Sequence, residues 1–198
     1  MIIRDINGIC NTGLGHKAFF NFKDTGKQDV RALLSSLIVQ LSNQSNAFYN
    51  ILLRFYTTNQ SGTQQPSIGS LTQCLENMLR VSGHVPIYLT VDALDECPNT
   101  TRMPSSRDQV LALLEKLVKW DLPSLHLCVT SRPEMDIRTS LEALTSPSNR
   151  ISLHDEKGQK EYIFRFVSAF YSDRNMQRWR DEDRRLVVET LYEGAGGM

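Results

Sequence analysis

Three short apolar runs have the composition of buried β-strands. They are AFFNF at 18–22, IYLTV at 87–91 and LHLCV at 125–129, and each is rich in β-branched or aromatic residues. A weaker run, RISL at 150–153, predicts a fourth strand. We therefore expect a sheet of short strands in the interior of the protein.

Segments with a helical period lie between these strands. Apolar residues recur on one face at 30–41 and again at 71–79, which predicts two helices that pack against a sheet. Ser106 followed by Gln109 fits a capping box and predicts that a third helix begins there and ends near Trp120. The three apolar stripes are Val30, Leu33, Leu34, Leu37, Ile38 and Leu41; Leu71, Leu75, Met78 and Leu79; and Val110, Leu111, Leu113, Leu114, Leu117 and Val118.

The order of these elements predicts an α/β fold. About 38 residues separate the start of the strand at 87 from the start of the strand at 125, which leaves room for a crossover helix and hence for parallel pairing. A parallel sheet with helices on both faces is the simplest architecture with this alternation. Polar segments at 59–70 and 98–105 are predicted loops.

The residues after the last predicted strand differ in character from those before it. The pattern from 157 to 194 is helical, with a strongly charged stretch, RNMQRWRDEDRR, in its middle. We therefore expect two parts: a core at 1–156 and a helical C-terminal extension of the same module at 157–198.

Composition narrows the functional classes. The 198 residues carry 22 basic and 22 acidic side chains, so no net charge attracts nucleic acid or an anionic membrane. No apolar run approaches the length of about 20 residues that a membrane span needs. The four cysteines are scattered without zinc-ligand spacing, which predicts reduced thiols in a cytoplasmic protein.

The ends of two predicted strands carry polar groups that suit phosphate chemistry. Asp92, Asp95 and Glu96 follow the strand at 87–91, and Thr130, Ser131 and Arg132 follow the strand at 125–129. Ligands of parallel α/β sheets bind beyond the carboxyl ends of the strands, so we expect these two clusters to meet at one rim. Crowded carboxylates also require a compensating cation or hydrogen-bond donors.

Carboxylates in this position can hold Mg²⁺ through bound waters and can orient an attacking water. A guanidinium nearby can bind a phosphate oxygen. Three other interpretations stay open. Asp95 and Glu96 could cap the following loop and helix, and Arg132 could form a salt bridge to these acids. An unrelated hydrolase could use Asp92 and Glu96 as its two catalytic carboxylates.

Several segments resemble the NACHT-type signal-transduction NTPases of fungal STAND proteins that have a nephrocystin-like N-terminal module. VPIYLTVDALDECP resembles their Walker B segment, LHLCVTSRPE their sensor 1 strand, and FFNFKDTGKQDVRALLSSLIVQLS the strand and helix between Walker A and Walker B. The similarity extends over nearly the whole chain. It implies a P-loop NTPase core with a three-layer sheet that binds ATP or GTP with Mg²⁺.

The resemblance also implies roles for individual residues. Asp92 matches the Walker B acid next to the metal, while Asp95 and Glu96 match the acids that position water, with Glu96 favoured as the base. Arg132 matches the sensor of the terminal phosphate. Thr130 and Ser131, which precede it, are the remaining candidates for cofactor binding.

The phosphate-binding loop of this family is not recognisable in the sequence. In GICNTGLGHKA, Gly8 and Gly13 have the spacing of G-x-x-x-x-G-K-[ST], but Leu14 stands where the lysine is required. Lys17 is followed by alanine rather than by a hydroxyl residue. We interpret this segment as a turn between a helix and the strand at 18–22.

The resemblance then implies a fragment that lacks the Walker A motif and the first strand. In the sheet order 5-1-4-3-2 that strand would lie next to the one at 125–129, so its loss would leave unpaired edges. We expect a NACHT-like core that does not hydrolyse nucleotide as it stands. The alternative is a non-catalytic module on the same scaffold that binds partner proteins or self-associates.

Overall fold

The computed structural model describes residues 8, 10, 14–59, 64–100, 104–152, 180, 182, 183, 186 and 190. The chain divides into two compact units, residues 1–144 and 145–198. The first unit contains the sheet and the helices described below. The division into functional parts at 156, expected from the sequence, stays a prediction.

The described sheet has three parallel strands in the order β1-β2-β3. β1 is His16–Asn21, β2 is Ile87–Asp92 and β3 is Leu125–Val129. All three predicted strands and their parallel pairing are therefore confirmed. β1 begins two residues before the apolar run, because the backbone N–H of His16 donates to the carbonyl of Pro86 at 2.8 Å and extends the pairing.

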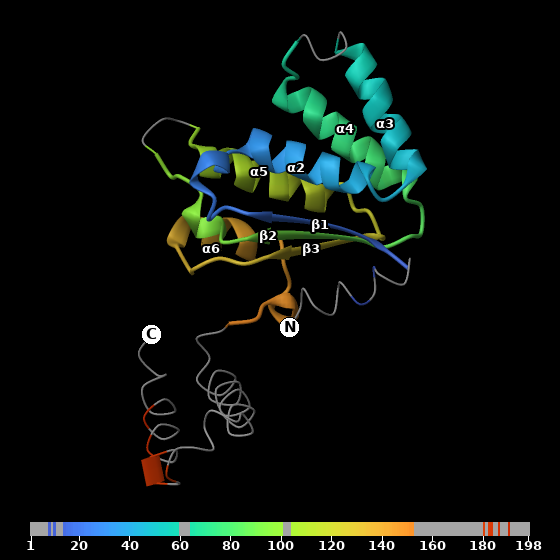
Figure 1. The fold of residues 1–198 in the computed structure, drawn as a ribbon. Helices are drawn as coiled ribbons and strands as arrows, with labels where there is room; N and C mark the ends of the chain where they lie inside the picture. The colour runs from blue at the N-terminus through green and yellow to red at the C-terminus, as the bar shows by residue number, and fades with distance from the viewer. Residues whose placement is uncertain are drawn as a thin grey trace. The chain divides into compact units, whose positions relative to one another are not determined.

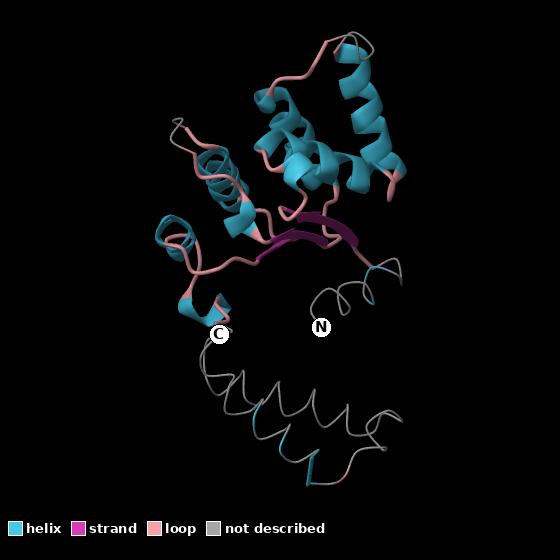
Figure 2. Ribbon diagram, turned by 60° about the vertical axis from the view of Figure 1, so that its left-hand side comes forward, coloured by secondary structure: helices cyan, strands magenta, loops and turns pink. Residues whose placement is uncertain are grey.

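Helices cover one face of this sheet (Figure 1). α2 and α5 lie directly over the strands, and α3 and α4 pack against α2 farther from the sheet. The same helices rise from one side of the strands when the molecule is viewed from another direction (Figure 2). The α/β class with a parallel sheet is thus confirmed; helices on the second face, which the sequence also predicted, stay a prediction. The helices are α2 (Val30–Ser42), α3 (Asn46–Thr58), α4 (Ile68–Val81), α5 (Ser106–Lys119) and α6 (Met135–Glu142).

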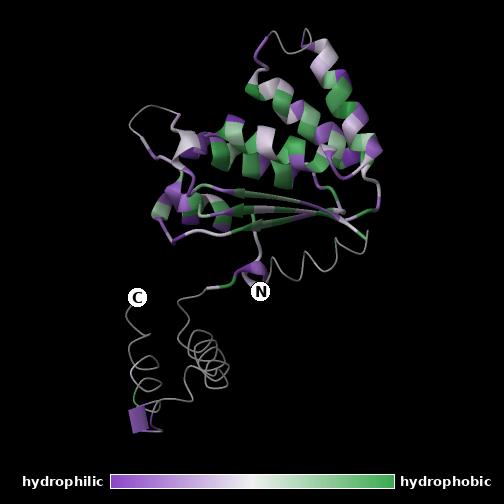
Figure 3. Ribbon diagram, in the orientation of Figure 1, coloured by the Kyte–Doolittle hydropathy of each residue, from purple (hydrophilic) through white to green (hydrophobic). Residues whose placement is uncertain are grey.

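The apolar stripes predicted from the sequence form the core. Every residue of the three stripes is buried except Val118, which is 42% exposed. Figure 3 shows hydrophobic residues on the helices next to the strands. The helix at 71–79 was expected to pack against the sheet, but α4 packs mainly against α2 and α3. Burial of each large apolar side chain contributes about 1.5–3 kcal/mol, which is why the pattern predicted the burial correctly.

The start of α5 differs from the prediction by one residue. Ser105, not Ser106, is the N-cap: its hydroxyl accepts from the N–H of Asp108 at 3.0 Å, and its own N–H donates to the Asp108 carboxylate at 2.8 Å. The predicted box with Gln109 was wrong because Asp108 is a charged acceptor of the right length at the third helical position. The hydrogen bond from the Ser105 N–H also lowers the pKa of Asp108.

One other predicted boundary changes. α4 begins at Ile68, inside the predicted loop at 59–70, because the hydroxyl of Ser67 accepts from the N–H of Ser70 at 3.0 Å and caps a helix there.

The predicted strand at 150–153 is not formed over residues 150–152, and Ile151 is 78% exposed. A strand requires a hydrogen-bonded neighbour, and within the described part of the chain none pairs with this segment. The predicted helical tail at 157–194 lies outside the described residues, apart from a few single positions. Among these, 182, 183, 186 and 190 are helical.

Candidate functional site

The carboxyl ends of the three strands bring the predicted polar residues to one rim. Asp92 ends β2, and its carboxylate accepts from the hydroxyl of Thr130, just after β3, through Oδ1. Its other oxygen, Oδ2, accepts from Nδ2 of Asn21, which ends β1, at 3.0 Å. Asp92 is therefore held from both neighbouring strands. The predicted convergence of the two strand tips is confirmed.

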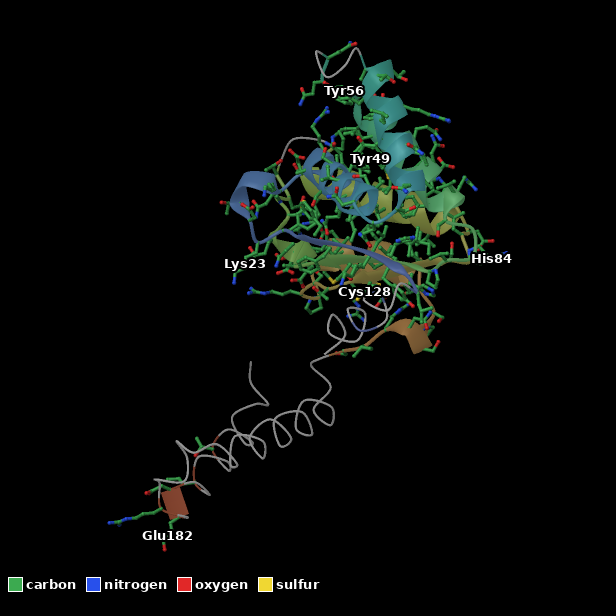
Figure 4. The ribbon with its side chains drawn as sticks, turned by 45° about the vertical axis from the view of Figure 1, so that its right-hand side comes forward. Lys23, Tyr49, Tyr56, His84, Cys128 and Glu182 are labelled. Carbon is green, nitrogen blue, oxygen red and sulfur yellow. The ribbon has the colours of Figure 1, made fainter. Side chains whose placement is uncertain are left out.

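Asn21 was not predicted from the sequence. Its side-chain carbonyl accepts from the N–H of Lys23 at 2.7 Å, so its NH₂ group faces Asp92. The signal that could have found it is an amide residue at the end of an otherwise apolar strand, FFNF. Figure 4 labels Lys23 at this end of the sheet and His84, which precedes β2, at the opposite end.

The turn after β2 is attached to the end of β3. Ala93 has a left-handed backbone (φ 55°), and its N–H donates to the Thr130 hydroxyl at 3.1 Å. The next N–H, from Leu94, donates to the Thr130 carbonyl at 3.0 Å, and the Leu94 side chain is fully buried. Thr130 therefore binds both the carboxylate and the backbone of the acidic turn.

Asp95 and Arg132 form an ion pair across the rim. Oδ1 of Asp95 accepts from the backbone N–H of Arg132 at 3.0 Å, and Oδ2 lies 3.4 Å from Nε of the same residue. The salt bridge considered as an alternative role of Arg132 is thus present. The Asp95 side chain is 9% exposed, whereas that of Arg132 is 79% exposed. The guanidinium consequently keeps most of its donors in solvent.

The remaining two predicted residues lie at the same rim with fewer contacts. Glu96 is exposed, and its carboxylate has no hydrogen bond or ion pair within the described part of the chain. The hydroxyl of Ser131 donates to the carbonyl of Arg132 at 2.8 Å, which is a local contact. Glu96 is therefore the carboxylate of this cluster that is available to solvent.

Arg107 stabilises the acidic turn through a buried guanidinium, and it was not predicted from the sequence. This residue of α5 is only 5% exposed, and its guanidinium donates to the carbonyl oxygens of Asp95 (2.6 Å) and Cys97 (3.0 Å). It also pairs with the carboxylates of Glu134 and Asp136 at the start of α6, the latter at 3.2 Å. The acidic turn and α6 are thus joined through one buried cation. An arginine in the first turn of a helix carries no distinguishing signal in the sequence.

The cysteines near the rim are not arranged as nucleophiles. All four thiols of the chain are free. Burial raises the pKa of Cys97 to about 11, although Arg107 acts in the opposite direction. Burial, together with the Asp92 carboxylate, also raises the pKa of Cys128. A raised thiol pKa keeps the reactive thiolate scarce at neutral pH.

The rim offers single carboxylates rather than a closed metal cage. No cluster of three or more His, Cys, Asp or Glu side chains among the described residues could hold a metal ion. Asp92 offers one oriented carboxylate, which is what Mg²⁺ needs when phosphates and waters supply its other ligands.

A cavity of about 240 Å³ lies elsewhere, between α2, α4 and α5, and is lined mainly by apolar groups such as Val30 and Leu113.

The glycine-containing segment before β1 does not form a phosphate-binding loop in the residues described. Lys17 lies within β1, opposite Tyr88, rather than at the junction of a loop and a helix. A Cβ on Gly15 would approach the carbonyl of Pro86 at 3.2 Å, so the glycine allows the chain to enter the sheet closely beside β2. The interpretation of this segment as a turn between a helix and the strand at 18–22 stays a prediction, because residues 9 and 11–13 lie outside the described part of the chain.

Comparison with known proteins identifies the family. A family model described as "Nephrocystin 3, N-terminal" matches residues 2–132, which include all three strands and the rim. No curated protein and no solved structure matches the chain. No helix among the described residues is both long and apolar enough to cross a membrane. The chain belongs to the nephrocystin 3 N-terminal family.

Proposed function

We propose that this chain carries the metal-side half of a nucleotide site of the NACHT type, for ATP or GTP with Mg²⁺. The single observation that carries the proposal is the position of Asp92, which ends the central strand and is held by donors from both neighbouring strands. The resemblance of DALDEC to a Walker B segment and of TSRPE to a sensor strand supports the same assignment.

Asp92 is the residue that would hold Mg²⁺, through water. When bound, the metal would neutralise negative charge on the nucleotide phosphates. Asn21 and Thr130 leave the Asp92 carboxylate little freedom to rotate, because each binds one of its oxygens. The role of Thr130 in this site is therefore positioning of the acid rather than direct contact with nucleotide.

Glu96 is the better candidate for the base that orients water. Asp95 is largely buried and paired with Arg132, whereas Glu96 is exposed and unpaired in the part of the chain that is described. Arg132 projects its guanidinium into solvent, where it can form paired hydrogen bonds to a phosphate. Ser131 would add a hydroxyl beside it after releasing its local hydrogen bond.

We further propose that these 198 residues do not hydrolyse nucleotide by themselves and that the protein acts in the cytoplasm. The sequence contains no G-x-x-x-x-G-K-[ST], the loop whose backbone N–H groups and lysine bind the phosphates. Without this loop, the residues that would contact the metal and the phosphates are Asp92 and Arg132. One carboxylate and one guanidinium make too few contacts for tight binding of a triphosphate.

The test is a titration of Mg·ATP and Mg·GTP against the chain, with phosphate release measured in parallel. We expect no turnover. A longer polypeptide, in which an apolar strand and a G-x-x-x-x-G-K-[ST] loop precede Met1, is expected to bind nucleotide in a magnesium-dependent way. In that protein Asp92→Asn should abolish the magnesium dependence, and Asp121→Asn, an exposed acid before β3, should leave it unchanged.

Two results would contradict the proposal. Turnover by the 198-residue chain that is lost in Asp92→Asn would show that the site is complete without the loop. Equal magnesium dependence of the Asp92→Asn and Asp121→Asn variants would show that Asp92 is not the metal-side acid.

A second candidate function is a non-catalytic module that binds other proteins. The observation that favours it is the outer edge of β3, which pairs with no strand in the described part of the chain.

A further inference from the structure

Arg107 binds the carbonyl groups of the residues before and after Glu96. Its Nη2 donates to the carbonyl of Asp95 at 2.6 Å, and its Nε donates to the carbonyl of Cys97 at 3.0 Å. The backbone N–H of Arg107 adds a third contact, to the carbonyl of Pro98 at 3.2 Å. The backbone on both sides of Glu96 is therefore attached to one residue of α5.

The side chain of Glu96 takes no part in these contacts. Its carboxylate is exposed and makes no hydrogen bond or ion pair with the described residues, whereas its backbone N–H donates to the carbonyl of Ala93 at 3.0 Å. A fixed backbone limits the directions that a side chain can take, because the allowed rotamers depend on φ and ψ. The contacts of Arg107 thus restrict where the free carboxylate of Glu96 can lie.

The positive charge of Arg107 is neutralised by α6 rather than by Glu96. Nη1 binds the carboxylates of Glu134 and Asp136, the latter at 3.2 Å. Asp136 is itself held by Nδ2 of Asn99 at 3.0 Å. A buried guanidinium requires counter-charges. Because two acids of α6 supply them, Arg107 can hold the turn without taking the carboxylate of Glu96 as its partner.

We propose that Arg107 is a positioning residue for Glu96, and that Glu134 and Asp136 keep it in that role by neutralising its charge. The proposal rests on the proposed function, in which Glu96 orients the attacking water. Arg107 is only 5% exposed, so it acts through the backbone of the turn and not on the nucleotide. A misplacement of about 1 Å can slow a reaction about a hundredfold, which is why the position of this backbone affects the rate.

Backbone dynamics of the 198-residue chain test the positioning without nucleotide. NMR relaxation gives an order parameter for the N–H of Glu96, expected near the value of about 0.85 that marks a rigid backbone. Arg107→Lys keeps the positive charge, but an ammonium lacks the planar fork that reaches all four acceptors, so the order parameter should fall toward about 0.6. Arg80→Lys, a surface arginine of α4 that pairs with Glu76, is the control and should leave it unchanged.

Turnover supplies a readout that a merely structural role would not change. In the longer polypeptide that carries the G-x-x-x-x-G-K-[ST] loop, Arg107→Lys should lower kcat for Mg·ATP at least about tenfold. KM should stay within about twofold, because Asp92 and Arg132 keep their contacts. In a Glu96→Gln background the same change should have no further effect on kcat, since Arg107 acts through Glu96.

A second variant keeps the test valid if Arg107→Lys does not fold, which urea denaturation shows. Glu134→Gln combined with Asp136→Asn removes both counter-charges at partly exposed positions and keeps the side-chain shapes. It should lower the order parameter of Glu96 in the same way. An unchanged order parameter in the folded variants, or a further fall in kcat when Arg107→Lys is added to Glu96→Gln, would overturn the proposal. Turnover that survives Glu96→Gln would contradict the proposed function itself, because Glu96 would not be the base.

Discussion

The side-chain amide of Asn21 donates a 3.0 Å hydrogen bond to Asp92, its register partner across β1 and β2. The same amide accepts from the backbone N–H of Lys23 at 2.7 Å, which sets its orientation. A central acid at the carboxyl edge of the sheet is thereby fixed by a residue from the adjacent strand. A mutation of Asn21, which lies outside the acidic turn, should therefore alter the arrangement of the rim.

Asn21→Asp should destabilise the protein. Aspartate can still accept from the Lys23 N–H, but it places a second carboxylate opposite Asp92 and removes the donor between them. We expect the free energy of unfolding in urea to fall by about 2 kcal/mol. Asn77→Asp is the control: it makes the same change at an exposed position of α4 and should stay within about 0.5 kcal/mol. Equal losses in the two variants would contradict the role of Asn21.

Arg107→Ala should be among the most destabilising changes in the chain. The buried guanidinium binds two carbonyl groups and two carboxylates, and its removal leaves these acceptors without their donor. We expect a loss of about 3–5 kcal/mol in urea denaturation.

Arg80→Ala is the matched control for this change. Arg80 pairs with Glu76 at 2.8 Å on the surface of α4, with half of its side chain exposed, so its loss should cost no more than about 0.5 kcal/mol. If Arg107→Ala were equally mild, the junction between the acidic turn and α6 would not depend on this residue.

Removal of Gln40 and Gln44 together should make the protein associate. The double alanine variant exposes the outward backbone groups of β1, which four side-chain hydrogen bonds now satisfy. Light scattering should show a mass that increases with protein concentration. Gln73→Ala, on the exposed face of α4, should remain unchanged. A double variant that stays monomeric at all concentrations would show that the β1 edge needs no cover.

Stability should decrease in alkaline solution because of two buried thiols. Burial raises the pKa of Cys74 and of Cys97 to about 11, above the value of 9.0 for an accessible thiol. Below pH 9 both states are protonated and the contribution is fully present. Between pH 9 and about 11 the unfolded chain releases protons that the folded chain retains, so stability falls.

Urea denaturation at a series of pH values tests this effect. The double variant Cys74→Ala and Cys97→Ala should be less stable at pH 8, because it loses buried groups, yet its stability should depend less steeply on pH above 9. All other ionisable groups are the same in both proteins, so the comparison isolates the thiols. Identical slopes would mean that the two thiols do not carry the alkaline decrease.

Local patterns were sufficient for much of the fold. The strands and the apolar faces of α2, α4 and α5 were predicted because burial follows a period that is readable along the chain. The cap of α5 was misplaced by one residue, since adjacent serines offer nearly equal hydroxyls and the choice depends on Asp108. The strand predicted at 150–153 is not formed over residues 150–152 for another reason. Its sequence pattern is local, but a strand requires a neighbouring strand with which it can form hydrogen bonds.

The candidate site was predicted in part. Asp92, Thr130, Asp95 and Arg132 were expected at one rim, because parallel strands end on the same side of a sheet, and they are in contact there. Their roles toward nucleotide remain proposals. The ion pair between Asp95 and Arg132, which separates Asp95 from Glu96 as a candidate base, depends on distances that no spacing in the sequence specifies.

The sequence by itself determined the strands, the helical faces and the acids at the strand ends, because each of these follows from residues close together in the chain. Only the tertiary structure decided that Asn21 orients Asp92, that Arg107 joins the acidic turn to α6, and that two glutamines cover the β1 edge of the sheet. These contacts join residues that are distant in sequence. A hydrogen-bonding side chain has many possible partners until the fold brings one of them within about 3 Å.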